Sequence, residues 1–255
     1  MQGHNKTLNH YLKRSASLAA AFIMLSFTTG GYSSVITIGC SEAESCTLEE
    51  LFAGGSITVN DKIFENWVLD FNTLVYDFSQ VVVTGLNDGG YDPGPGLRYE
   101  FNGNLSIKVS HEIELDTVFY YTVATTEEPA FIKDASLTLI DYQFENVFGG
   151  VGVNEFISQC QLHPWPYIGD LSIGANEEGA GFFDSVEFTR QPSLFVSTEL
   201  LLYAYPTGLG GIGSAGIESF EQRFSQTIIP VPPALWLFGS GLLGLVGIAR
   251  RKKPS

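Results

Sequence analysis

Basic residues are scarce in the central part of this sequence. All 28 Asp and Glu residues lie between Glu42 and Glu221, whereas seven of the 13 Lys and Arg residues lie within residues 1–33 or 250–255. Residues 34–229 therefore combine six basic with 28 acidic residues, a net charge of −22. This charge excludes binding to nucleic acid or to anionic membranes through long-range electrostatics. It favours solubility outside the cell, and binding of cations such as calcium is the alternative.

The sequence also contains little cysteine, only three residues in 255. This excludes a small scaffold held together by many disulfides. Cys40 and Cys46 flank a short polar loop, and we predict that they pair in an oxidising compartment. For Cys160 we favour a buried thiol, and a catalytic thiol beside His163 is the alternative.

Motifs that carry catalysis are missing between the two ends of the chain. No His-Glu-x-x-His, Gly-x-Ser-x-Gly, EF-hand or Walker pattern occurs there. The many carboxylates offer pairs for glycoside hydrolysis, but no spacing singles out any of them. We therefore predict a protein that is not an enzyme and has no cofactor, with a secreted hydrolase as the lesser alternative.

The N-terminus has the three parts of a secretory signal peptide. Lys6, Lys13 and Arg14 are cationic, residues 16–27 are apolar, and small residues follow up to Ser33. This order is typical of a segment that the Sec translocon and signal peptidase recognise. We predict a signal peptide over residues 1–33, and a permanent N-terminal anchor is the alternative.

The last 26 residues form a second membrane-directed segment. Residues 227–233 are rich in proline and predict an extended stalk. Residues 234–249 carry no charge and, with the preceding residues, approach the roughly 20 residues that span a bilayer. The basic tail at residues 250–255 should stay cytoplasmic by the positive-inside rule. It contains Arg250, Arg251, Lys252 and Lys253.

This order of a proline motif, an apolar helix and a basic tail resembles the PEP-CTERM sorting signal of Gram-negative bacteria. The resemblance rests on Pro230, Val231 and Pro232, on residues 234–249 and on the four basic residues, about a tenth of the chain. Val231 stands where the family usually has Glu. The resemblance implies recognition by a membrane-embedded exosortase, passage through an inner-membrane intermediate, and delivery to the cell surface or extracellular matrix. A tail kept as a single-span anchor of a periplasmic domain is the alternative.

Residues 34–226 predict an all-β body. Short runs rich in Val, Ile, Phe, Tyr and Thr alternate with Gly, Asn and Asp. Residues 105–109 and 137–141 show clean period-two alternation, which is typical of antiparallel sheets with one buried face. We predict an antiparallel β-sandwich, jelly-roll-like. One short helix is expected over residues 47–52, with Thr47 and Glu50 forming a capping box.

Three loops are expected to interrupt this body. Asp88 and Asp92 lie in a Gly- and Pro-rich segment and are weak candidates for a calcium site, against an ordinary turn. Residues 206–216 predict a flexible glycine-rich loop. Trp165 and Tyr167 flank a proline in a third loop and could stack on sugar rings, whereas the simpler interpretation buries Trp165.

These features together favour a non-enzymatic exported protein of the cell surface or extracellular matrix, associated with exopolysaccharide or biofilm. A carbohydrate-binding, lectin-like module that uses Trp165 and Tyr167 is the alternative.

Overall fold

The computed structural model describes the body of the chain. The described residues are 34–73, 77–90, 92–109, 113–126, 130–145, 147–159, 167–176, 178–206 and 213–228. The predicted signal peptide, the sorting motif Pro230-Val231-Pro232, the apolar segment and the basic tail lie outside them, as do Cys160 and Trp165. No helix within the described ranges is long and apolar enough to cross a membrane.

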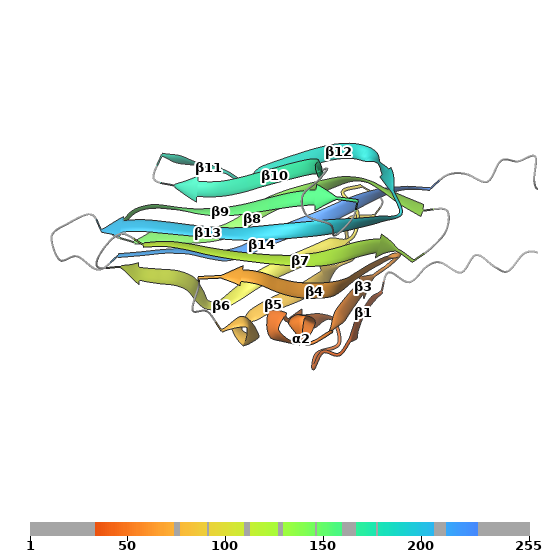
Figure 1. Ribbon diagram of the computed structural model, residues 1–255, viewed down its shortest axis with the longest axis horizontal. Coiled ribbons are helices and arrows are strands. Elements are labelled where there is room, and N and C mark those ends of the chain that lie inside the picture. The colour runs from red at the N-terminus through yellow and green to blue at the C-terminus, as the bar shows by residue number, and fades with distance from the viewer. Residues whose placement is uncertain are drawn as a thin grey trace, which may run out of the picture. The chain divides into compact units, whose positions relative to one another are not determined.

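The body consists of two antiparallel sheets, here called sheet A and sheet B (Figure 1). The order in sheet A is β1 (Val35–Ile38), β3 (Ser56–Val59), β4 (Lys62–Asn72), β7 (Ile113–Thr125), β13 (Ser193–Pro206), β9 (Val147–Ser158), β10 (Tyr167–Asn176) and β11 (Gly179–Gly181). The order in sheet B is β12 (Phe183–Gln191), β8 (Ala130–Glu145), β14 (Gly213–Ile228), β6 (Gly96–Val109), β5 (Val81–Leu86) and β2 (Ser45–Thr47).

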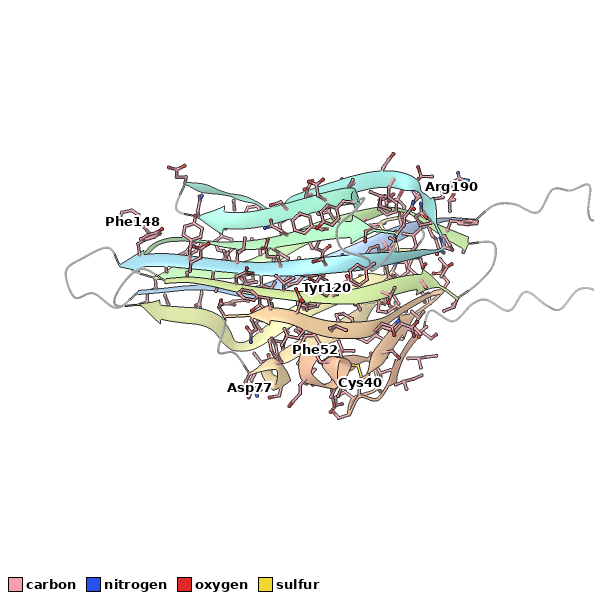
Figure 2. The ribbon with its side chains drawn as sticks, in the orientation of Figure 1. Cys40, Phe52, Asp77, Tyr120, Phe148 and Arg190 are labelled. Carbon is pink, nitrogen blue, oxygen red and sulfur yellow. A yellow bond between two sulfur atoms is a disulfide. The ribbon has the colours of Figure 1, made fainter. Side chains whose placement is uncertain are left out.

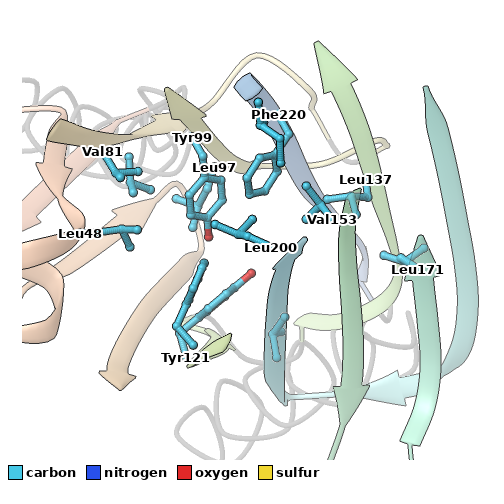
Figure 3. Packing of buried hydrophobic residues seen from close by; sticks show 14 of the residues in the cluster. Leu48, Val81, Leu97, Tyr99, Tyr121, Leu137, Val153, Leu171, Leu200 and Phe220 are labelled. Carbon is cyan, nitrogen blue, oxygen red and sulfur yellow. The ribbon is translucent and has the colours of Figure 1, made fainter. Parts of the chain in front are cut away.

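The two sheets pack face to face through aromatic and aliphatic side chains (Figure 3). Tyr99 of β6 stacks on Phe220 of β14, with ring centroids 4.4 Å apart. Phe64 of β4 reaches Phe224 of β14 across the two sheets at 5.9 Å. Aromatic pairs of this kind add to the burial of apolar surface that drives the sheets together. The predicted antiparallel β-sandwich is therefore confirmed, while its jelly-roll connectivity stays a prediction.

The predicted helix and disulfide are also confirmed. Helix α2 (Leu48–Phe52) begins at Thr47, whose side chain accepts a hydrogen bond from the Glu50 amide, and Glu50 completes the capping box. Cys40 and Cys46 form a disulfide just before this helix, with Cα atoms 5.1 Å apart (Figure 2). A short 3-10 helix, η1 (Phe78–Gln80), leads into β5. Helix α2 packs against the sandwich, because its Leu48 and Leu51 side chains insert into the core.

Several strands differ from what the sequence indicated. Strands β2, β10 and β11 were not expected. Residues 105–109 are the end of a longer strand, because β6 runs from Gly96 to Val109 past an irregularity in its pairing with β14. The predicted glycine-rich loop is also too long, since β14 already begins at Gly213 and pairs with β6.

Candidate functional site

The outer face of sheet A, which points away from sheet B, carries side chains that are not part of the hydrophobic core. Val151, Val153 and Ile157 of β9 are buried between the sheets, while Gly152 and Asn154 alternate with them. Because successive side chains of a strand point to opposite faces, the alternating set lies on the outer face. The same holds on β13, where Leu200 and Leu202 are buried and their neighbours are more exposed.

This face contains an open groove of about 730 Å³. Its walls and floor come from β9, β10, β13, the hairpin of β10 and β11, and Glu114 of β7. The volume is in the range of small-molecule binding sites. The groove is therefore the main candidate site among the described residues.

Glycines form the floor of the groove. Gly152 and Gly174 are direct cross-strand partners on β9 and β10. In the neighbouring row, the Tyr203 ring lies against Gly150, where any side chain would collide with it. A Cβ added at Gly152 would meet only ordinary contacts, at 3.7 Å from the Ile173 carbonyl and 3.8 Å from Leu201 Cβ. The sheet backbone is thus open to a ligand at Gly152.

A row of polar side chains lies beside this floor. Glu199, Asn154 and Ser172 are in register across β13, β9 and β10. Asn154 Nδ2 donates to Glu199 Oε2 at 2.8 Å, and Ser172 Oγ donates to Asn154 Oδ1 at 2.8 Å. The Ser172 amide donates to Asp184 Oδ2 at 2.9 Å. The mutual hydrogen bonds hold these donors and acceptors in fixed positions.

Three aromatic side chains lie near one end of the groove. Tyr203 and Tyr205 of β13 are 38% and 42% exposed, and Phe148 of β9 is 55% exposed. Tyr205 is in register with Phe148, and the rings of Tyr203 and Tyr205 meet edge to face at 6.2 Å. Figure 2 shows Phe148 near one end of the long strands. Exposed rings that are grouped in this way are typical of binding surfaces.

A second aromatic group lies farther along the same face. Phe156 stacks on Tyr167 at 5.0 Å, and Tyr120 packs on Phe195 at 5.3 Å. Tyr120 also donates to Asp70 Oδ2 at 2.6 Å. Partial burial, together with this carboxylate, raises the pKa of Tyr120 to about 12. Tyr167 therefore lies on the same face as the groove, as a stacked ring of β10.

The groove and its surroundings are acidic. Glu114 and Glu178 line it, and none of the described residues that line it is a Lys or Arg. Asp116 of β7 lies beside it, where burial and then the charges of Glu199 and Glu114 raise the pKa of its carboxyl. A negatively charged ligand would be repelled here.

The two calcium candidates, Asp88 and Asp92, each pair with a cationic side chain. Asp88 pairs with Arg223 Nη1 at 2.7 Å, and this hydrogen bond lowers the pKa of Asp88. Asp92 pairs instead with Lys133 Nζ at 3.0 Å. Each carboxylate thus has a cation as its partner and anchors the loop to sheet B. Within the described parts of the chain, no three His, Cys, Asp or Glu side chains form a group that could hold a metal ion.

The sequence pointed to Tyr167 as a candidate but not to Tyr203, Tyr205, Phe148 or the glycine floor. These residues lie in strands with ordinary β composition, and only the pairing of β9 with β13 brings them together. The exposed aromatics at alternate positions of one strand, Tyr203 and Tyr205, were the available signal.

The fold and the groove define an acidic β-sandwich protein with an open polar site on one sheet. No family model and no curated protein matches the chain. Two solved structures are distantly similar. TmCBM61 in complex with beta-1,4-galactotriose shares 11% identity at a TM-score of 0.24, covering 62% of this chain and 88% of its own. Endoglucanase 3 of Trichoderma harzianum, from family GH12, shares 9% identity at a TM-score of 0.21, covering 63% and 97% respectively. Similarity at this level carries no argument about function.

Proposed function

We propose that this chain is a non-enzymatic exported protein of the cell surface or extracellular matrix, where it associates with exopolysaccharide. An exosortase recognises Pro230-Val231-Pro232 and removes the apolar segment and the basic tail. The observation that carries this proposal is the fixed order of proline motif, uncharged apolar run and four basic residues at the end of the chain.

Two features of the body support this proposal. The Cys40–Cys46 disulfide suits an oxidising compartment outside the cytoplasm. The charge of residues 34–229 suits a protein that must stay soluble after export. The last described strand, β14, ends at Ile228, so the motif follows the folded body directly.

Replacing both Pro230 and Pro232 by Ala is expected to abolish release of the protein from the membrane. The exosortase would no longer find its motif, while the apolar segment would still insert. Immunoblotting of membrane, medium and matrix fractions measures the outcome, and Pro233→Ala serves as the matched control. Normal release of the double variant would argue against sorting through this motif and for a different route of export.

A further inference from the structure

We propose that the groove on the outer face of sheet A binds a neutral polysaccharide chain. This proposal rests on the proposed function in one respect only: export brings the protein to the place where it meets the polysaccharide. It concerns the described body alone, and it holds whether or not the tail is removed.

The shape of the groove suits a flat, extended ligand. With Gly152 and Gly174 as its floor, a ligand can lie directly on the sheet backbone. The groove is open rather than enclosed by a lid of described residues, because its walls are strands and one hairpin. An open groove on a sheet admits a section of a long chain as readily as a free end.

The chemistry of the groove matches hydroxyl-rich rings. Sugar hydroxyls both donate and accept hydrogen bonds, and the row of Glu199, Asn154 and Ser172 offers carboxylate, amide and hydroxyl groups of both kinds. Sugar rings also have apolar faces of C–H groups, which pack on aromatic rings. Tyr203 supplies such a ring at the groove wall, and Tyr205 and Phe148 extend it.

The aromatic groups at the two ends of the face indicate that a bound polysaccharide would run parallel to the strands. Gly150 faces Tyr203, and Phe156, six residues farther along β9, carries the stacked ring of Tyr167. Six residues of strand span roughly 20 Å. A polysaccharide that lies along the strands would meet one aromatic group, then the polar row, then the other group.

The charge of the face determines the class of polysaccharide. Glu114, Glu178, Asp116 and Glu199 place carboxylates in or beside the groove, and the described part of its lining contains no cationic side chain. Polysaccharides that carry uronate or sulfate groups would be repelled. Neutral hexose polymers, such as glucans and galactans, carry no charge and would not be repelled.

The test is affinity electrophoresis of the full chain, purified with its disulfide in mild detergent and in the presence of a chelator. The probes are a soluble neutral glucan, a soluble neutral galactan and a polyuronate. Two variants address the groove: Tyr203→Ala removes the aromatic wall, and Gly152→Val fills the floor with a residue that strands accept well. The matched controls on β12 are Phe183→Ala, at an exposed aromatic, and Ser185→Val, at an exposed small residue.

The wild-type chain is expected to be retarded by at least one neutral polymer and not by the polyuronate. Each groove variant is expected to lose at least about tenfold in affinity, and the two controls should bind as the wild type does. Three results would overturn the proposal: no retardation of the folded wild-type chain by either neutral polymer, retardation by the polyuronate, or unchanged binding of both groove variants. None of these results bears on release from the membrane, so the sorting proposal is tested separately.

Discussion

Replacing Asp61 by Asn is expected to lower the free energy of unfolding by about 3–5 kcal/mol, because it removes the nearest counter-charge of a buried ammonium group. Lys62 is fully buried at the start of β4. Its Nζ lies 3.2 Å from Asp61 Oδ1 and donates to Gln226 Oε1 of β14 at 2.6 Å. Burial lowers the pKa of Lys62, and the nearby Asp61 and Asp134 carboxylates oppose this shift.

A double-mutant cycle isolates this interaction. Lys62→Met alone leaves the nearly buried Asp61 carboxylate without its cationic partner. Lys62→Met combined with Asp61→Asn removes both charges and is expected to recover most of the lost free energy of unfolding. The exposed pair of Lys133 and Asp92 is the matched control, and Asp92→Asn should cost less than about 1 kcal/mol. Urea unfolding monitored by tryptophan fluorescence measures all four variants. Strictly additive costs in the cycle would show that the buried pair does not act as a unit.

Replacing Glu155 by Gln is expected to stabilise the protein at neutral pH by about 1 kcal/mol or more and to flatten its dependence on pH. Glu155 of β9 is fully buried between the sheets. It accepts hydrogen bonds from Gln222 of β14 and, at 3.5 Å, from Thr198 of β13. Burial raises the pKa of Glu155 well above its ordinary value, and these hydrogen bonds only partly oppose the shift.

The protonated form of Glu155 explains an otherwise unpartnered atom. Gln222 Nε2 donates to the carboxyl, but Gln222 Oε1 is buried and has no hydrogen-bond partner. A protonated carboxyl can donate to that oxygen and close a two-bond ring with the amide. A Gln side chain at position 155 can form the same ring without a titrating group. The Glu155→Gln variant should therefore keep the hydrogen bonds to Gln222 and avoid only the free-energy cost of ionising a buried carboxyl group.

The sign of the pH effect follows from the direction of the shift. Because the pKa of Glu155 is higher in the folded than in the unfolded state, the stabilisation from its proton is complete below the unfolded value of 4.5. It is lost as the pH rises toward and through the folded pKa. Urea midpoints measured from pH 4 upward should fall more steeply for the wild type than for Glu155→Gln. Glu187→Gln, at an exposed position of β12, is the control. Parallel curves for the wild type and Glu155→Gln would contradict a buried protonated carboxyl.

Much of the fold was predictable because hydrophobic alternation is a local signal. Residues 137–141 lie in β8 as expected, and Leu137 and Leu139 face the core, although both Ile140 and Asp141 are exposed. Strand β10 was missed although Leu171, Ile173 and Ala175 alternate toward the core. Gly169 and Gly174 weaken the β-propensity of the segment, and pairing with β9 and β11 stabilises it as a strand.

Residues 213–216, which include two glycines, show the opposite error. Composition alone predicts a loop, yet β14 begins at Gly213 and lies between β6 and β8. Strands on both sides satisfy its backbone hydrogen bonds, which outweighs the poor strand propensity of glycine. Propensity is thus overridden where a segment occupies the centre of a sheet.

The groove was not predictable from the sequence. The sequence offered Trp165 and Tyr167 as candidate sugar-binding aromatics, with burial of Trp165 as the simpler interpretation, and it did not single out Tyr203. Gly150 and Tyr203 are far apart in the sequence and become neighbours through the register of β9 with β13. No local pattern encodes that register, since it depends on the packing of both sheets.

The most direct test of the proposed export and sorting is mass spectrometry of the C-terminus of the mature protein, after cells, medium and matrix have been separated. Sorting predicts a terminus close to Pro230–Pro233 in the extracellular fraction. A protein that ends at an intact Ser255 in the inner membrane would contradict sorting, and it would indicate a periplasmic β-sandwich held by a single-span anchor.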